Sequence, residues 1–248
     1  MNKPVINLKE IKDVNSLLQK AKWLEGKTLA QIGDEIRKQD PTSRVLTKGE
    51  VGYVIEKGFF GIEKNSDAKP DIEHLGVEIK TCPLKFDSTK TKLSVKEPLS
   101  LNMIDYCEEY KNKDIKESSL YKKNQKILFV LYIHDKSKLR SEYLIKYVFL
   151  WEMDKRVIDE LSQDYKLIVK KIKEGKAHEI HQYEHGYLTL CPKHNGNFKD
   201  PNDKISKRQQ PFSNILAEKR AFRLKNSYMN LIISRFLKKP LLKGGWII

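Results

Sequence analysis

The sequence predicts a mixed α/β fold, and three observations support that class. Apolar residues recur at helical spacing in the first third, the middle is dense in β-branched, aromatic and leucine residues, and a long helical pattern follows. At 248 residues the chain can bury the core of one large domain or two small ones. Because no repeat or low-complexity linker divides it, we expect residues 1–248 to form a single domain that is cleft into two lobes.

The expected elements follow in chain order. Helices are predicted at 8–26, 28–39 and 49–60, strands at 74–82, 92–101, 126–134 and 143–153, then a helix at 154–176, a strand at 186–193 and a helix at 227–239. Gly26 stops the first helix, since glycine tolerates the backbone that ends a helix. The four central strands should form one mixed sheet flanked by helices.

The net charge limits the possible partners. The chain carries 48 Lys and Arg against 33 Asp and Glu, a net charge of +15, which predicts a polyanionic partner, either nucleic acid or an anionic membrane. The membrane alternative is the weaker one, because no apolar run approaches the roughly 20 residues of a spanning helix. The N-terminus also lacks the apolar core of a signal peptide, so we expect a cytoplasmic protein.

Two other classes of site are disfavoured. Cys82, Cys107 and Cys191 are odd in number and widely spaced without a C-x-x-C pair, which argues against a disulfide framework and a structural zinc site. We expect these cysteines to be reduced and partly buried. The chain contains no glycine-rich phosphate loop of the G-x(4)-G-K-[ST] kind, so no nucleotide cofactor is expected.

The basic residues concentrate near the C-terminus. Between Lys204 and Lys243 eleven Lys or Arg residues stand against one acid, Glu218. Such a run is most often a solvated face. Here aromatic and amide residues interleave with the charges in "KRQQPFSNILAEKRAFRLKNSY", which favours a surface that grips phosphates and also reaches bases.

The segment "KPDIEHLGVEIKTCP" contains the candidate catalytic residues. Alternation along a strand puts Glu78 and Lys80 on the face opposite Val77 and Ile79. A turn at the polar run before the strand would let Asp71 fold back beside it. Two carboxylates and an ammonium group could then converge.

This combination suits phosphodiester hydrolysis. The carboxylates can hold Mg²⁺ through oxygen ligands, and the lysine can orient or help to deprotonate the attacking water. The spacing D-x(6)-E-x-K is only moderately specific. One alternative is a hairpin edge whose Glu and Lys form an exposed pair, in a basic DNA-binding module without catalysis.

Five motifs add a family resemblance. In this order, "KGEVGYVIEKGFFG", "KPDIEHLGVEIKTCPL", "LYKKNQKILFVLYI", "GYLTLCPK" and "KRAFRLKNSYMNLII" resemble the MutH mismatch-repair endonucleases and the related type II restriction endonucleases that cut at GATC. The segments "LSLNMIDY", "EGKAHEI" and "QPFSNILAEKRAFRLKNSYM" resemble the restriction branch more. The resemblance implies a type II restriction endonuclease-like, PD-(D/E)xK fold with a DNA cleft between two lobes.

The resemblance also implies the active-site residues. Asp71, Glu78 and Glu56 match the family's metal-binding acids, Lys80 its motif lysine and Lys123 its second active-site lysine. Lys122 is an alternative for the last role. Directly after Glu56 the chain has one residue more than the family. The alternative for Glu56 is a polar position on an amphipathic helix, without a role in the site.

DNA contacts are implied in the same way. Lys48 and Gly49 match a pair near the DNA backbone, and Lys193 matches a loop lysine that reads guanine, although without the resemblance it would be a solvated cation. The further expected DNA-binding residues are Lys207, Arg208, Arg220, Arg223 and Lys225. Cys191 stands where the repair protein has an arginine. Arg223 stands where it has a tyrosine beside the methylation-sensitive adenine.

The sequence therefore predicts a Mg²⁺-dependent, type II site-specific deoxyribonuclease that acts on GATC in duplex DNA and leaves 5′-phosphate and 3′-hydroxyl ends. The alternative enzyme is a methyl-directed GATC nicking endonuclease of mismatch repair. A palindromic site suits a homodimer on DNA. The chain can be a whole protein or the catalytic part of a longer one.

Overall fold

The computed structural model describes residues 5–43, 51–63, 68–181, 184, 186–243 and 245–247. The chain divides into two compact units. The first unit consists of Met1–Glu97, Lys126–Glu152 and Leu237–Ile248, and the second unit consists of Pro98–Gln125 and Met153–Phe236. Each unit combines helices with a sheet, so the predicted mixed α/β class is confirmed.

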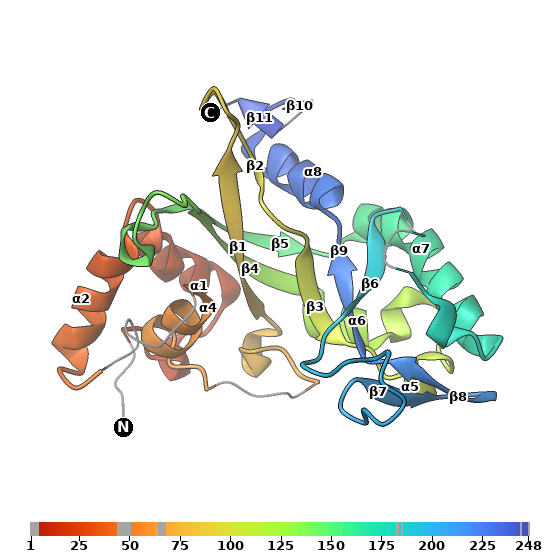
Figure 1. The fold of residues 1–248 in the computed structure, drawn as a ribbon. Coiled ribbons are helices and arrows are strands. Elements are labelled where there is room, and N and C mark those ends of the chain that lie inside the picture. Colours follow the sequence, from red (N-terminus) through yellow and green to blue (C-terminus); the bar gives the residue numbers. More distant parts are fainter. Residues whose placement is uncertain are drawn as a thin grey trace. The chain divides into compact units, whose positions relative to one another are not determined.

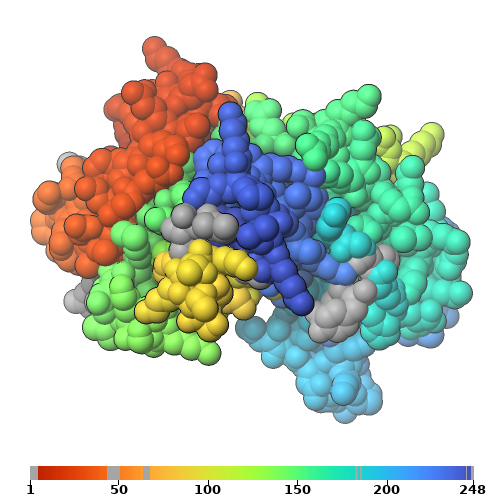
Figure 2. Space-filling view, turned by 90° about the horizontal axis from the view of Figure 1, so that it is seen from above, coloured from red at the N-terminus to blue at the C-terminus, as the bar shows by residue number. Residues whose placement is uncertain are grey.

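The first unit contains a six-stranded sheet in the order β10-β11-β2-β1-β4-β5. Its strands are β1 (Glu78–Phe86), β2 (Lys92–Val95), β4 (Lys126–Ile133), β5 (Ile145–Glu152), β10 (Leu241–Leu242) and β11 (Gly245–Ile247). Only β1 and β4 pair in parallel, and the other neighbours are antiparallel, so the sheet is mixed as expected. The C-terminal strand β11 pairs with β2, and Figure 2 shows the chain end beside the turn that joins β1 to β2.

Helices cover one face of this sheet (Figure 1). They are η1 (Leu8–Glu10), α1 (Val14–Ala21), η2 (Lys22–Leu24), α2 (Leu29–Gln39), α4 (Val51–Tyr53) and the π-helical η3 (Val54–Phe59), with the short turns η4 (Glu73–Leu75) and η6 (Arg140–Glu142) elsewhere in the unit. Their buried side chains form one core with the inner face of the sheet, including Leu17, Ile32, Ile55, Val77, Ile79, Leu128 and Val130. The sheet face that carries Val77 and Ile79 is therefore fixed by apolar burial.

The first predicted helix is shorter in the structure than in the prediction. The carboxylate of Asp13 accepts a hydrogen bond from the Ser16 amide and so caps α1, which leaves residues 8–10 in a separate turn. The second predicted helix is confirmed as α2, where Thr28 and Gln31 form a capping box. Gly26 adopts a φ of 76° between the two, which fits its predicted role as a stop.

The second unit contains a three-stranded sheet in the order β3-β9-β6 and a two-stranded hairpin. The strands are β3 (Leu99–Met103), β6 (Leu188–Pro192), β7 (Lys207–Gln210), β8 (Ser213–Glu218) and β9 (Arg220–Leu224). The helices are α5 (Tyr106–Glu109), η5 (Ile115–Glu117), α6 (Ser119–Asn124), α7 (Lys155–Lys173), η7 (Ala177–Glu179) and α8 (Asn226–Leu237). Tyr165 of α7 contacts the ring of Phe222 on β9, so this helix packs on the three-stranded sheet.

One strand prediction was wrong, and three strands were not predicted. The segment 92–101 was expected to be one strand, but it forms β2 and β3, which belong to different sheets. Pro98 lies between them and has no amide hydrogen to donate to a ladder, so the strand ends there. The basic region contains the predicted final helix, as α8, and also β7, β8 and β9, which were not predicted. In β9, Arg220 and Arg223 interrupt the apolar alternation by which a strand is recognised.

Cys82, Cys107 and Cys191 are all free thiols, and the first and last are buried, as predicted. Within the described ranges no helix is long and apolar enough to cross a membrane.

Candidate active site

The turn that follows Asp71 brings this residue beside the start of β1. Residues Glu73–Leu75 form a 3-10 turn, and Gly76 follows with a φ of 64°, in the left-handed region that favours glycine. The backbones of Ile72 and Val77 then hydrogen-bond to each other in both directions, at 2.9 and 3.2 Å. Asp71 folds back beside the strand as predicted, and the turn at Glu73–Gly76 that follows Asp71 makes this reversal.

Asp71 and Glu78 bind each other through the backbone. The Asp71 amide donates to Glu78 Oε2 at 3.1 Å, and the Ile79 amide donates to Asp71 Oδ2 at 2.9 Å. Lys80 Nζ donates to Glu78 Oε1 at 2.5 Å. The three candidate catalytic residues therefore converge in one hydrogen-bonded cluster, as the sequence predicted.

The predicted alternation along β1 is confirmed. Val77 and Ile79 are fully buried in the core beneath the helices, while Glu78 and Lys80 share the other face. The Glu78 residue is only 2% exposed, and Lys80 is half-buried. A buried carboxylate is costly unless it is paired and hydrogen-bonded, and the Lys80 ammonium and the Asp71 amide meet that need.

The cluster lies at the start of β1, where the edge of β1 that faces β2 does not pair with that strand. The pairing of β1 with β4 begins at Glu78, opposite Ile127, but the pairing with β2 covers only Leu84–Phe86. The Asp71 carboxylate accepts the amide hydrogen of Ile79 at this edge, where a strand would otherwise do so. The amide of Ile79 is therefore satisfied by a side chain and not by a neighbouring strand.

The side chains in this cluster fit a divalent cation. Asp71 and Glu78 supply carboxylate oxygens, which are the ligands that Mg²⁺ and Ca²⁺ prefer. Among the side chains that the structure describes, no group of three or more His, Cys, Asp or Glu residues is arranged to hold a metal ion. Mg²⁺ commonly uses one or two carboxylates and completes its shell with water and substrate phosphates, so a pair is a sufficient donor set.

Glu56 lies on the first turns of a helix that changes from α to π geometry. Residues Val54–Phe59 form the π turn, in which the Phe60 amide donates to the Ile55 carbonyl at 3.0 Å. A π turn contains one residue more than an α turn, which is the length difference that the family resemblance places directly after Glu56. A Cβ added to Gly52 would lie in ordinary contact with Glu56 Oε1, at 3.5 Å, so Gly52 lies next to this carboxylate.

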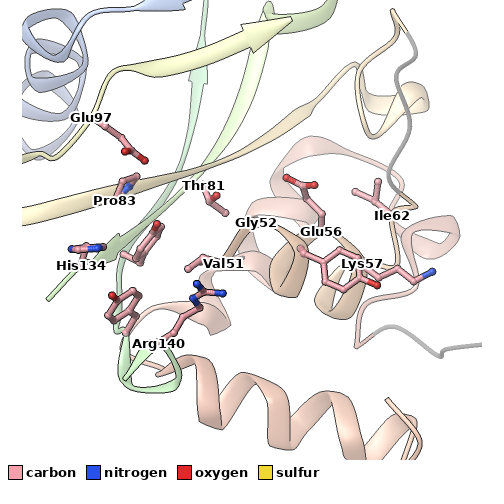
Figure 3. Close-up of a pocket in the computed structure, with 13 residues that line it drawn as sticks. Val51, Gly52, Glu56, Lys57, Ile62, Thr81, Pro83, Glu97, His134 and Arg140 are labelled. Carbon is pink, nitrogen blue, oxygen red and sulfur yellow. The ribbon is translucent and has the colours of Figure 1, made fainter. Parts of the chain in front are cut away.

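A cavity of about 660 Å³ opens beside Glu56 in the first unit (Figure 3). Figure 3 shows Glu56 rising from its helix toward strand β1, on which Thr81 also faces the cavity. The added Cβ at Gly52 would lie 3.3 Å from Thr81 Oγ1. The lining residues are Val51, Gly52, Tyr53, Glu56, Lys57, Ile62, Thr81, Pro83, Glu97, Tyr132, His134, Arg140 and Tyr143. By the alternation along β1, Thr81 lies on the face of Val77 and Ile79, and none of Asp71, Glu78 and Lys80 lines this cavity.

The two candidates for the second active-site lysine belong to the second unit. Lys122 and Lys123 occupy the last turn of α6, directly before β4, and Lys122 is the more exposed of the two. The Asn124 amide group fixes this turn by donating to the Leu120 carbonyl at 2.9 Å and to Asn102 Oδ1 at 2.8 Å.

The expected DNA-binding residues differ in how they are held. Lys193 is exposed directly after β6. Lys207 Nζ donates to the carbonyls of Asp200 and Pro201, and Arg208 Nη1 donates to the Ile104 carbonyl at 2.5 Å.

The three remaining DNA-binding candidates lie on or directly after β9. Arg223 is half-buried and pairs in register with Thr189 of β6, and Lys225 follows the strand. Arg220 is buried in an ion pair with Glu218. Lys48 and Gly49 lie outside the described residues.

One histidine differs from its expected environment. Sequence reasoning favours a solvent-exposed or phosphate-side role for the histidines of this chain. His194 instead has a side chain that is only 8% exposed, and its Nε2 lies 3.1 Å from Glu218 Oε1. The partner is 24 residues away, so no local pattern indicated the contact.

Comparisons with known proteins agree with this geometry. Residues 60–164 match the family model "DNA mismatch repair enzyme MutH", a range that includes the Asp71, Glu78 and Lys80 cluster. The chain is 37% identical over 221 residues to the type II restriction enzyme Sau3AI of Staphylococcus aureus, which covers 88% of this chain and 42% of that protein.

Two mismatch-repair proteins named MutH are similar over nearly their full length. The protein from Actinobacillus pleuropneumoniae serotype 5b is 26% identical over 229 residues, covering 92% of this chain and 96% of its own. The protein from Shewanella baltica is 28% identical over 221 residues, which cover 88% of this chain and 93% of that protein.

The matched family model and the names of these relatives point to the class of enzymes that act on DNA. Residues 60–164 belong to the MutH family by their match to its model, and the chain as a whole is similar both to a restriction enzyme and to mismatch-repair proteins. The chain spans 42% of the length of Sau3AI.

Proposed function

We propose that the chain is a Mg²⁺-dependent DNA endonuclease unit of the type II restriction kind, specific for GATC in duplex DNA. The observation that carries the proposal is the cluster in which Asp71, Glu78 and Lys80 are joined by hydrogen bonds of 2.5 to 3.1 Å. The 37% identity to a type II restriction enzyme supports the choice of that branch. The net charge of +15 supports a polyanionic substrate.

The residues of the cluster have distinct roles in this proposal. Asp71 and Glu78 would hold Mg²⁺, with Glu56 as a further acid of the site. When bound, the cation supplies positive charge to the phosphate oxygens and lowers the pKa of a water molecule. Lys80 orients the attacking water and places positive charge near the phosphate. Lys123, or its neighbour Lys122, would contribute a second cation near the phosphate.

The reaction is a hydrolysis with a simple balance. A bond forms between the water oxygen and phosphorus, and the bond from phosphorus to the 3′ oxygen breaks. The 3′ oxygen takes a proton, and the phosphate stays on the 5′ end. The products are therefore 5′-phosphate and 3′-hydroxyl ends.

DNA recognition is assigned to basic residues outside this cluster. Lys193 would donate to O6 and N7 of guanine in the major groove, because its loop position is exposed and directly follows a strand. Phosphate contacts are assigned to Lys48 with Gly49, Lys207, Arg208, Arg223 and Lys225. A palindromic GATC site suits two catalytic units related by a two-fold axis, so a homodimer on DNA is part of the proposal.

A second candidate function is methyl-directed nicking at GATC during mismatch repair. The similarity to two proteins named MutH favours this function, because the chain covers 96% and 93% of their lengths. The two candidates share the same chemistry and differ in the state of the DNA and in the number of strands cut.

A plasmid-cleavage assay tests the proposal. Plasmids with one GATC site and with none are incubated with the protein in Mg²⁺ and in excess chelator. Linear product only from the GATC plasmid, and only with Mg²⁺, is expected. A protein that binds the plasmid but cuts neither under any metal condition would instead be a non-catalytic DNA-binding module.

A further inference from the structure

Three charged side chains lie together next to Lys193 in the second unit. Glu218 Oε1 lies 3.1 Å from His194 Nε2, and Arg220 Nη2 donates to Glu218 Oε2 at 2.6 Å. His194 Nδ1 lies 3.0 Å from the Gly196 carbonyl oxygen. The two oxygens of one carboxylate therefore hold two different basic side chains.

This cluster is buried, unlike the surface ion pairs of the chain. The side chains of His194, Arg220 and Glu218 are only 8%, 9% and 12% exposed. A buried charge is stable only when it is paired and hydrogen-bonded, so each member of the cluster depends on the others. Removing the central carboxylate would leave Arg220 uncompensated.

The cluster fixes both ends of the short segment that carries Lys193. On one side Pro192 pairs in register with Arg220 in the ladder of β6 and β9. On the other side His194 is bound to Glu218. The Lys193 amide itself donates to the Lys219 carbonyl at 3.0 Å, so the backbone of this exposed lysine is bound to the segment between the two charged partners.

Neighbouring groups hold the cluster in place. Tyr106 Oη donates to the Glu218 carbonyl at 2.7 Å, and the Ile104 amide donates to the Arg220 carbonyl at 3.0 Å. The loop after His194 is closed by Asp203, which accepts hydrogen bonds from the amides of Ile205 and Ser206. The support beneath Lys193 is therefore continuous with β3 and α5.

We propose that Glu218, with His194 and Arg220, positions Lys193 for base reading, and that Arg220 acts there and not as a phosphate contact. The inference rests on the proposed function, because it requires that Lys193 contacts a base. A long flexible lysine discriminates between bases only when its backbone is held in a fixed place relative to the groove, and this cluster supplies that constraint.

The test is a double-substitution cycle on specificity. Wild type, Lys193→Ala, Glu218→Gln and the double variant are compared by kcat/KM on a GATC duplex and on a duplex with one base pair of the site changed. We expect Glu218→Gln to lower the ratio of the two values about tenfold while leaving the affinity for a duplex without a site unchanged. In the double variant the ratio should fall no further than in Lys193→Ala alone.

Two variants guard against misinterpretation. His194→Gln leaves the ion pair between Glu218 and Arg220 intact, so it carries the test if Glu218→Gln melts below the assay temperature. Lys199→Ala is a matched control, since Lys199 is another exposed lysine on the same loop. It should leave the ratio unchanged.

The outcomes separate the inference from the proposed function. A wild-type protein that cuts both duplexes equally, or a Lys193→Ala variant that keeps full discrimination, refutes the assignment of Lys193 itself. If Lys193→Ala loses discrimination but folded Glu218→Gln and His194→Gln keep it, the positioning role is wrong. The positioning role would also be wrong if the double variant lost more discrimination than Lys193→Ala alone, by the amount that Glu218→Gln loses by itself. Glu218 would then act independently of Lys193.

Discussion

The amide of Asp71 donates a hydrogen bond to the carboxylate of Glu78, at 3.1 Å. In return, the carboxylate of Asp71 accepts the amide hydrogen of the residue that follows Glu78. The Glu78 carboxylate is thus held by the backbone of Asp71, and the Asp71 carboxylate is held by the backbone directly after Glu78. The two carboxylates are therefore held ready before any ligand arrives, which is the condition for electrostatic catalysis without reorganisation.

Asp71→Ala or Glu78→Ala is expected to reduce cleavage by more than about 100-fold. Removing a group that only orients a metal ligand lowers activity by about 10- to 100-fold, and removing the ligand itself should lower it further. DNA binding should be largely retained, since removing a negative charge does not weaken attraction to phosphates. Cleavage and gel-shift assays measure the two effects. Glu73→Gln is the control, an exposed acid of the same turn that pairs with Lys69. Wild-type cutting by either alanine variant would contradict the metal assignment.

Gly76→Ala is expected to destabilise the protein by about 1 kcal/mol, because an alanine is strained at a φ of 64° although no atom lies within 4 Å of the new Cβ. Gly26→Ala is the matched control, with a φ of 76° and equally open space. Both should lower the urea midpoint by a similar amount. Only Gly76→Ala should also reduce cleavage, because its turn holds Asp71. Equal cleavage by the two variants would show that the turn does not set the site.

Lys193→Ala is expected to lose about 1 to 3 kcal/mol of discrimination between GATC and altered duplexes, the worth of a good base contact. Binding titrations at several salt concentrations measure this loss together with the salt slope. Equal weakening on GATC and on scrambled DNA, with only a shallower slope, would reassign Lys193 to the phosphate backbone.

The protein is expected to cut both strands of unmethylated GATC without a partner. Arg223 stands where the repair family has a tyrosine that lies beside the methylated base, and a flexible charged fork is poorly suited to sense a methyl group. Purified protein is incubated in Mg²⁺ with unmethylated, hemimethylated and fully methylated duplexes, and both labelled strands are resolved on a denaturing gel. Nicks confined to the unmethylated strand of the hemimethylated duplex would favour the repair enzyme.

The second unit should lose stability in acid through Glu160. Arg235 donates to both Glu160 oxygens, at 2.6 and 2.9 Å, and this contact lowers the pKa of Glu160 from 4.5 to about 2. Because the folded pKa is the lower one, the stabilisation is complete above pH 4.5 and is lost as the pH falls toward 2. After solvent screening it should be on the order of 1 kcal/mol.

Thermal unfolding between pH 2 and pH 6 measures this effect. Arg235→Gln should flatten the acid limb of the curve, whereas Arg156→Gln, which removes a longer contact of 3.2 Å to the same carboxylate, should change it less. An unchanged acid limb in Arg235→Gln would rule out this ion pair as the source.

The parts of the fold that were predictable are those set by neighbouring residues. The alternation of Val77 and Ile79 with Glu78 and Lys80 is a local property of one strand, and the structure confirms it. The strand pattern of β4 and β5 is equally local, because both are dense in buried apolar residues.

The parts that could not be predicted depend on distant partners. Residues 92–101 were predicted as one strand; Pro98 marks the break, but the separate sheets of β2 and β3 follow from their pairing with β11 and β9, which are distant in the sequence. The burial of His194 depends on Glu218, which a different strand supplies. Likewise, the π turn at Glu56 is not visible in apolar spacing, although the extra residue after Glu56 was its one signal in the sequence.

The hydrogen bond from the Ile79 amide to Asp71 has a consequence for measurement. An amide whose hydrogen is accepted by a side chain exchanges with solvent deuterium only when that side chain moves away. In wild type, slow exchange at Ile79 therefore reports that the Asp71 carboxylate is in place, and Asp71→Ala should make this one amide exchange faster. The fold thus contains an isotope-exchange probe inside the candidate site, which can follow the position of the Asp71 carboxylate in protein without bound DNA.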